Sequence, residues 1–216
     1  MFRDRHEAGQ MLGLALLDYK AREPVIYALP RGGVEVAAEV AMALNAPLEL
    51  LLVRKIGLPW RPELAMGAAT DSGAPIVFRN EEVLKTARIS TEVFNDASTC
   101  ALAEIKRRRR CYLGDQVPLD PEGRVVIVVD DGIATGATMK VALMALHRQQ
   151  PKSIILAVPV AARQSLEELR KEADKTVCLE MPDDLIAVGC HYQKFPQLDD
   201  DDVVRLLAEV RARHAQ

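Results

Sequence analysis

Short apolar runs alternate with amphipathic stretches along most of this chain. The apolar runs predict strands over Pro24–Leu29, Pro47–Val53, Arg124–Val129, Ser153–Val158, Thr176–Leu179 and Leu185–Val188. Helical spacing of apolar residues predicts helices over His6–Leu17, after Gly33 through Asn45, and over Gly136–Gln149, Ala162–Ala173 and Asp200–Arg213. Strand–helix–strand units of this length pair in parallel through right-handed crossovers. We therefore expect an α/β fold with a parallel-centred sheet flanked by helices.

The middle of the chain departs from this alternation. Arg54–Glu63 is basic and rich in Pro and Gly, which favours a loop. Two short strands are expected around the turn Asp71-Ser72-Gly73, over Leu64–Thr70 and Ala74–Phe78. Residues 80–117 are polar and charged, with a helical pattern, so we interpret them as a helical insertion within a single domain spanning residues 1–216.

Composition narrows the classes of function. The net charge is −3 and aromatic residues make up 4% of the chain, which disfavours nucleic acid as a partner. The four cysteines form no CxxC pair, so we expect reduced thiols in a cytoplasmic protein. The N-terminus lacks the apolar core of a signal peptide, and no apolar run approaches the ~20 residues that cross a membrane.

The segment Val125–Thr138 joins a buried strand to a loop of small residues and a helix. Asp130 and Asp131 end the strand, and adjacent carboxylates need hydrogen-bond donors or a cation, which the hydroxyls of a ribose would supply. Gly132 and Gly136 permit positive φ and close approach of a ligand. The free N–H groups that open the helix favour a phosphate. The residues expected to bind a ribose and its phosphate are Asp130, Asp131, Gly132, Ala134, Thr135, Gly136, Ala137 and Thr138.

Two further segments carry cations after predicted strands. In Leu29–Gly33, two glycines let backbone N–H groups converge on an anion, and Arg31 adds forked donors. An ordinary strand-to-helix turn is the alternative. Arg54 and Lys55 follow the next predicted strand, where a solvated basic loop is the alternative.

Val126–Thr138 resembles the phosphoribosyl pyrophosphate motif of type I phosphoribosyltransferases, which is an apolar strand followed by two acids and a TGxT loop. In that family the acids hold the ribose hydroxyls and the loop holds the 5′-phosphate. The resemblance implies these roles for Asp130, Asp131 and Ala134–Thr138. It extends over about residues 24–160, and the segment 80–117 with the N-terminal FRDR resembles a bacterial subgroup of unassigned substrate.

The resemblance also covers the two cationic segments. Leu29–Gly33 is similar to the pyrophosphate loop, which reads Arg-Gly-Gly in xanthine-guanine enzymes and commonly holds a non-proline cis peptide. Arg54-Lys55 is similar to the string that leads into the mobile catalytic loop of adenine enzymes. It implies that residues 56–66 close over the site. The implied pyrophosphate-binding residues are Arg31, Gly32 and Gly33, and the implied catalytic cations are Arg31, Arg54 and Lys55.

Mg²⁺ is the implied cofactor, and we expect it to arrive on the substrate because it retains several waters and uses few carboxylates. Ala134 occupies a position where hypoxanthine-guanine enzymes carry an Asp, which disfavours 6-oxopurines without establishing adenine. Candidates for a small hood over the base are Phe2–Arg5 and His191–Phe195, within residues 1–20 and 178–200. Simple packing is the alternative for both.

The sequence therefore favours transfer of a phosphoribosyl group between phosphoribosyl pyrophosphate and a nitrogenous base. The alternative is a non-catalytic regulator that binds phosphoribosyl pyrophosphate or a nucleotide and contacts nucleic acid through Arg107–Arg110. That arginine run is also typical of a solvated helix end. The acceptor base and the oligomeric state stay open, a homodimer included.

Overall fold

A five-stranded parallel sheet forms the centre of the computed structural model, which describes residues 1–71 and 75–214. Its strand order is β2-β1-β6-β7-β8, and every neighbouring pair is parallel. The strands are β1 (Val25–Ala28), β2 (Leu48–Leu50), β6 (Val125–Val129), β7 (Ser153–Val160) and β8 (Lys175–Glu180). The α/β prediction is confirmed, with the most apolar run in the middle of the sheet.

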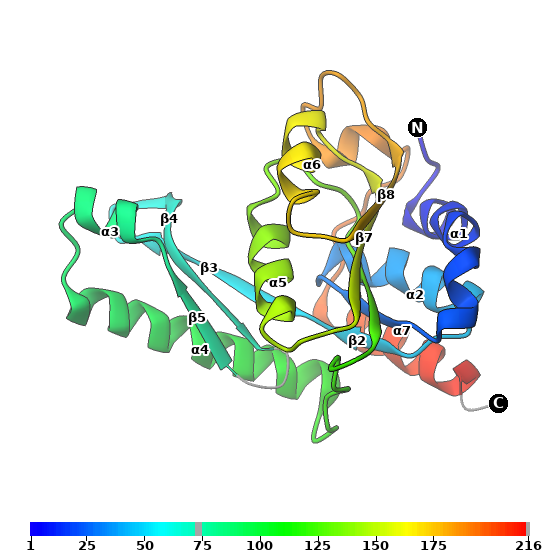
Figure 1. Cartoon of the computed structure of the whole chain (residues 1–216), viewed down its shortest axis with the longest axis horizontal. Coiled ribbons are helices and arrows are strands. Elements are labelled where there is room, and N and C mark those ends of the chain that lie inside the picture. The colour runs from blue at the N-terminus through cyan, green and yellow to red at the C-terminus, as the bar shows by residue number, and fades with distance from the viewer. Residues whose placement is uncertain (72–74, 215–216) are drawn as a thin grey trace.

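Helices cover both faces of this sheet (Figure 1). Alternate residues of β6 supply the two cores: Ile127 packs among residues of α1, α2 and α7, whereas Val126 and Val128 pack among residues of α5 and α6. This follows from the two-residue repeat of a strand. The helices are α1 (Arg5–Ala15), α2 (Gly32–Leu44), α5 (Ala137–His147), α6 (Arg163–Leu169) and α7 (Asp200–His214), with 3-10 turns η1 (Leu17–Arg22) and η2 (Val188–His191).

A second sheet extends to one side as an arm (Figure 1). It is antiparallel, in the order β3 (Leu52–Leu58), β4 (Arg61–Asp71) and β5 (Pro75–Arg79). The strand predicted over 64–70 falls within β4, and the described part of the strand predicted over 74–78 falls within β5. Residues 72–74, which include most of the predicted turn, lie outside the described residues. Helices α3 (Glu81–Thr86) and α4 (Thr91–Leu113) lie in the segment 80–117, and α4 packs on β3 and β4.

The prediction of a loop over Arg54–Glu63 is wrong. These residues belong mostly to β3 and β4, which meet at a tight turn after Leu58. The glycine that favoured a loop sits at an irregularity of the ladder, where the register shifts on either side of Gly57. A Cβ there would lie 2.3 Å from the carbonyl oxygen of Pro62, so close strand packing requires glycine.

Two other boundaries differ from the sequence prediction. The single strand expected over 47–53 is divided at Leu51 into β2 and the start of β3, which belong to different sheets. No strand forms over 185–188. Ile186 is 90% exposed there, so its short apolar pattern reflects a surface segment. Among the described residues, no helix combines the length and apolarity needed to span a membrane.

Candidate functional site

The two loops predicted to bind anions lie against each other at the carboxyl ends of β1 and β6. A Cβ added to Gly32 would lie 1.9 Å from Oδ2 of Asp131, and one added to Gly33 would lie 2.9 Å from the Cα of Asp130. Neither glycine has a positive φ. The two glycines are therefore required by close packing of one loop on the other, which places both acids beside the start of α2.

The two acids differ in their electrostatic environment. Asp130 is partly buried, and its Oδ1 accepts a hydrogen bond from the backbone N–H of Asp131 at 2.8 Å. Burial, followed by the neighbouring charge of Asp131, raises the pKa of Asp130 well above its ordinary value. Asp131 instead accepts a hydrogen bond from Nε of Arg5 at 2.7 Å, and the Arg5 side chain is only 5% exposed. One acid is thus held by a buried cation, while the other is biased toward its neutral form.

Arg5 is fixed by residues from the far end of the chain. Its Nη1 donates to the carbonyl oxygen of Pro196 at 2.8 Å, and its guanidinium lies 3.7 Å from the ring centroid of Phe195. The hydroxyl of Tyr192 donates to the carbonyl oxygen of Asp131 at 2.5 Å. These contacts join the N-terminal segment, the loop after η2 and the second acid into one cluster.

The two segments predicted to form a hood lie side by side. Phe2 and Tyr192 form a parallel β-bridge, and their ring centroids are 5.5 Å apart. The N–H of Phe2 donates to the carbonyl oxygen of His191 at 2.8 Å. The ring of Tyr192 also contacts that of Phe195 at a tilt of 34°, with centroids 5.0 Å apart. Whether this aromatic cluster binds a base stays a prediction.

The loop after Asp131 leads directly into the open N-terminus of α5. Gly136 has a φ of 73°, a conformation that favours glycine, and it is the N-cap residue of α5 without a side-chain cap. Gly132 could also adopt a positive φ, but it does not do so here. A Cβ there would lie 2.5 Å from Val188, so close packing against η2 explains this glycine.

Contacts on both sides hold this loop in place. Ile133 forms a β-bridge with Ala161, and its N–H donates to the carbonyl oxygen of Val160 at 2.9 Å. The hydroxyl of Ser165, on α6, donates to the carbonyl oxygen of Ala134 at 2.6 Å. The side chain of Ile133 is buried, whereas Ala134 is exposed. These contacts fix the backbone of the loop and so the position of the N-terminus of α5.

Arg31 lies next to the acids, at the end of the first loop. The peptide bond between Pro30 and Arg31 is cis, as the resemblance implied. The Arg31 side chain is 36% exposed, and its Nη1 is 3.8 Å from Oδ1 of Asp200 at the start of α7.

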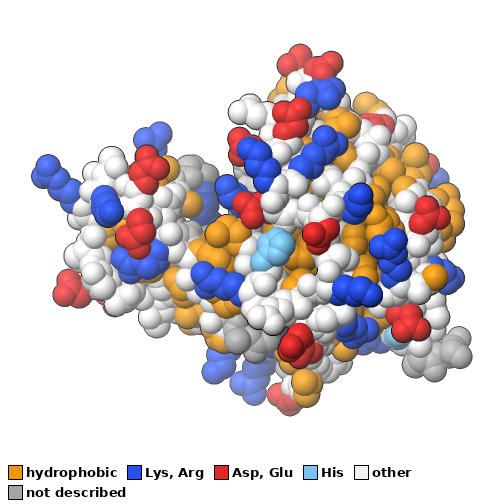
Figure 2. Space-filling model, viewed as in Figure 1, with side chains coloured by type: hydrophobic (Ala, Val, Ile, Leu, Met, Phe, Trp, Pro, Cys, Tyr) orange, Lys and Arg blue, Asp and Glu red, His pale blue; other side chains and the backbone are white. Residues whose placement is uncertain are grey.

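Arg54 and Lys55 lie on opposite faces of β3, because successive side chains of a strand alternate. Arg54 borders a small recess together with Pro30 and residues of α4. Lys55 borders a cavity of about 430 Å³ between the arm and α5, shared with Thr138. Figure 2 shows apolar side chains where the arm meets α5, with Lys and Arg around them. The prediction that both cations act on one pyrophosphate is untested, but they approach the site from different sides.

A model of the phosphoribosyl transferase domain matches residues 7–194, which include both loops and both acids. This chain belongs to the phosphoribosyl transferase family.

Proteins similar to this phosphoribosyl transferase support that assignment. A Mycobacterium tuberculosis H37Rv protein named "Putative phosphoribosyl transferase Rv0571c" is 38% identical over 209 residues, which are 96% of this chain and 46% of that protein. The chain thus spans about half the length of the curated relatives it matches. A crystal structure of TT1426 from Thermus thermophilus has a TM-score of 0.83 and 36% identity, covering 96% of this chain and 98% of that one. AQ2163 from Aquifex aeolicus, with a TM-score of 0.53 and 14% identity over 94% of this chain and 83% of its own, shares the fold.

Sequence reasoning missed the long-range contacts that support the site. Arg5 contacts Asp131 across 126 positions of sequence, and Ser165 contacts Ala134 across 31. No local pattern marks such pairs. The approach of Asp200 to Arg31 depends on how α7 packs on α2.

Proposed function

We propose that this protein transfers a phosphoribosyl group between phosphoribosyl pyrophosphate and a nitrogenous base in a Mg²⁺-dependent reaction. The observation that carries the proposal is the packing of Asp130 and Asp131 against the glycines of the Pro30–Gly33 loop, beside the open N-terminus of α5. Carboxylates, free backbone N–H groups and cations are the complementary partners of ribose hydroxyls, a monophosphate and a pyrophosphate.

Each part of the substrate has a proposed partner. Asp130 and Asp131 accept hydrogen bonds from the ribose hydroxyls. The backbone N–H groups of Ala134–Thr138, with the hydroxyls of Thr135 and Thr138, donate to the 5′-phosphate. The amides of Gly32 and Gly33, with the Arg31 guanidinium, bind the pyrophosphate. Arg54 and Lys55 add positive charge from the two faces of β3.

Catalysis in this proposal is mainly electrostatic. Breaking the bond between C1 of the ribose and pyrophosphate places positive charge on the sugar and further negative charge on the leaving group. The acids face the ribose, and the arginines face the pyrophosphate, so each charge develops next to its opposite. Ala134 carries no acid–base group, and no proton transfer to the base is assigned to it.

The residues present fit a magnesium ion that arrives with the substrate. Asp131 is already paired with Arg5, and burial disfavours the charged form of Asp130. Among the described residues, no group of three or more His, Cys, Asp or Glu side chains is arranged to hold a metal ion. When bound, Mg²⁺ would neutralise part of the charge on the pyrophosphate and orient its oxygens.

The test is release of pyrophosphate from phosphoribosyl pyrophosphate and Mg²⁺, with an acceptor chosen by a thermal-shift screen of nucleobases. We expect Arg54→Ala and Lys55→Ala to lower kcat by about tenfold or more while changing substrate affinity less, because their charges act most strongly as pyrophosphate departs. Exposed Lys106, on α4, provides a control variant, Lys106→Ala, of the same charge change. Tight Mg²⁺-dependent binding without turnover on any base would replace this proposal with a non-catalytic regulator.

A further inference from the structure

Helix α4 brings an arginine to the edge of the candidate pyrophosphate loop. Arg108 of α4 borders the same small recess as Pro30 and as Arg54 of β3. The recess therefore joins residues from three separate elements. The side chain of Arg108 is 35% exposed, so it is accessible from solvent.

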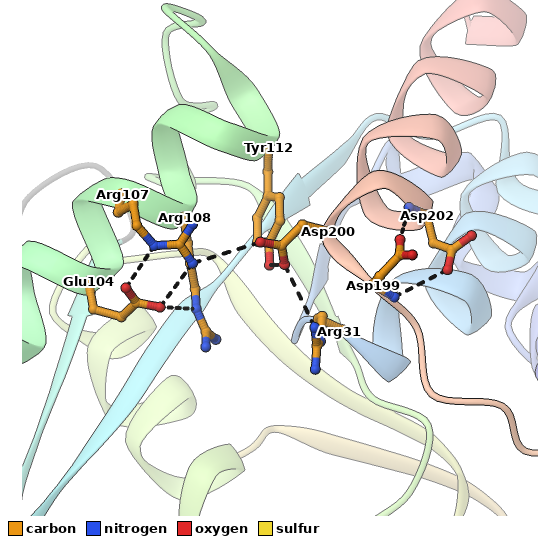
Figure 3. A network of polar contacts seen from close by, with 8 residues as sticks. All are labelled: Arg31, Glu104, Arg107, Arg108, Tyr112, Asp199, Asp200 and Asp202. Atoms are coloured by element: carbon orange, nitrogen blue, oxygen red, sulfur yellow. Dashed lines mark hydrogen bonds and ion pairs between the residues drawn. The ribbon is translucent and has the colours of Figure 1, made fainter.

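A second arginine of α4 meets Arg31 through a shared carboxylate. Nη2 of Arg107 is 3.7 Å from Oδ2 of Asp200, and Nη1 of Arg31 is 3.8 Å from Oδ1 of the same side chain. The hydroxyl of Tyr112 donates to Oδ1 of Asp200 at 2.6 Å. Figure 3 shows Tyr112 and Arg107 reaching Asp200 from α4, with Arg31 on its other side.

Glu104 holds both arginines of α4 in position. It accepts hydrogen bonds from Arg107 at 2.8 and 3.1 Å and from Arg108 at 2.9 Å. These hydrogen bonds lower the pKa of Glu104 to about 2, so the carboxylate stays charged throughout the neutral range. A solvated helix face would show only such contacts within α4, one turn apart. Here Arg107 also approaches Asp200, and Arg108 also borders the recess beside Pro30. These contacts outside α4 distinguish the cluster from a solvated helix face.

The cluster carries an excess of positive charge at the pyrophosphate side of the site. It contains four guanidinium groups and two carboxylates, those of Glu104 and Asp200, so positive charges exceed negative charges by two. The guanidinium groups are those of Arg31, Arg54, Arg107 and Arg108. Charge-assisted hydrogen bonds are usually 2.7–2.9 Å long, so the longer approaches to Asp200 leave donors on Arg31 and Arg107 for another anion.

We propose that α4 completes the pyrophosphate-binding half of the site, with Arg107 and Arg108 binding the pyrophosphate together with Arg31 and Arg54. Asp200 competes with the ligand by attracting Arg31 and Arg107 when no anion is bound. This inference rests on the proposed function, and it gives the helical segment 80–117 a role in binding the leaving group.

The test compares two fragments of the substrate by calorimetry in the presence of Mg²⁺: pyrophosphate and ribose 5-phosphate. The double variant Arg107→Gln/Arg108→Gln should bind pyrophosphate about tenfold more weakly or worse, the effect of losing at least one charge-assisted hydrogen bond. Its affinity for ribose 5-phosphate should stay within about twofold, which also shows that the variant is folded. Arg110→Gln removes one positive charge from an exposed position of the same helix and should leave both affinities unchanged.

Unchanged pyrophosphate affinity in the double variant, with both fragments bound by the wild type, would overturn the role of α4 and leave the proposed function standing. A wild type that binds neither fragment would overturn the proposed function. Asp200→Asn supplies an independent test, because it removes the competing charge and retains an oxygen that can accept from Tyr112. It should tighten pyrophosphate binding several-fold. Weaker or unchanged binding in this variant would refute the competition by Asp200.

Discussion

Adjacent Asp→Asn substitutions at positions 130 and 131 should have opposite effects on stability. Both acids directly follow β6, and a sequence-based view treats them as equivalent ligand groups that leave folding unaffected. The structure separates them, because Asp131 forms an ion pair with buried Arg5 while Asp130 is partly buried beside another acid. We therefore expect Asp131→Asn to destabilise the protein and Asp130→Asn to stabilise it at neutral pH.

The magnitude for Asp131→Asn follows from the burial of its partner. Arg5 is 5% exposed, and its Nε lies 2.7 Å from Oδ2 of Asp131. Removing one charge of a buried ion pair costs about 3–5 kcal/mol. The carbonyl oxygen of Pro196 and the ring of Phe195 still contact Arg5, so the loss should lie near about 3 kcal/mol, the lower end of that range. Combining Asp131→Asn with Arg5→Met should recover part of it, because no buried charge is then left unpaired.

The sign for Asp130→Asn follows from its raised pKa. The pKa of Asp130 is higher in the folded state than in the unfolded chain. Such a carboxyl contributes its full stability at pH values below its pKa in the unfolded chain, and this contribution is lost as the pH rises through its pKa in the folded state. The substitution removes the ionisation but keeps an oxygen that accepts from the N–H of Asp131. Its stabilising effect should therefore grow from about pH 4 upward.

Urea unfolding of wild type and both single variants, at several pH values between about 4 and 8, tests this reasoning, because midpoints can be compared at constant slope. Both variants should bind ribose 5-phosphate more weakly, so a binding measurement separates stability from function. A destabilised Asp130→Asn variant at pH 8, or an Asp131→Asn variant as stable as wild type, would refute the electrostatic assignment.

Two further substitutions test the packing of the site. Gly32→Ala should lower the free energy of unfolding by about 1–3 kcal/mol and weaken pyrophosphate binding, because its Cβ would lie 1.9 Å from Oδ2 of Asp131; a thermal melt with calorimetry checks both effects. Ser165→Ala should lower the free energy of unfolding by about 1 kcal/mol and weaken ribose 5-phosphate binding several-fold, because it removes the hydrogen bond to the carbonyl oxygen of Ala134. Unchanged binding would show that the loop is held without this hydroxyl.

The sequence was most informative where local pattern and tertiary position coincide. The uninterrupted apolar run before Asp130 is typical of a strand buried on both faces, and β6 is indeed central in the sheet. After this strand the sequence has two acids, a run of small residues and a helical pattern. This order correctly predicts a loop that leads from β6 into α5. Gly136, with its φ of 73°, was predicted for the right reason.

The arm and the support of the site were less predictable. Pro and Gly between positions 54 and 63 favoured a loop, yet the pairing of β3 with β4 accommodates them at a register shift and a tight turn. Recognising a strand there would also have placed Arg54 and Lys55 on opposite faces. The pairing of Arg5 with Asp131 depends on how the N-terminal segment packs at the end of the sheet, which no pattern within that segment encodes.

The contacts of the two acids also relate ribose binding to pH. The protein uses Oδ1 of Asp130 for the N–H of Asp131, and Oδ2 of Asp131 for Arg5. In the proposed function, the second oxygen of each carboxylate accepts a hydrogen bond from a ribose hydroxyl. Without ligand, a proton on Asp130 relieves the repulsion between the acids, which is one reason why its pKa is raised. A ribose hydroxyl that donates to Asp130 replaces this proton, so affinity for ribose 5-phosphate should rise with pH through the raised pKa of Asp130. Binding of pyrophosphate depends on arginines, which stay charged in this range. The affinity for pyrophosphate should therefore not change with pH, as long as the pH values compared leave pyrophosphate in one charge state.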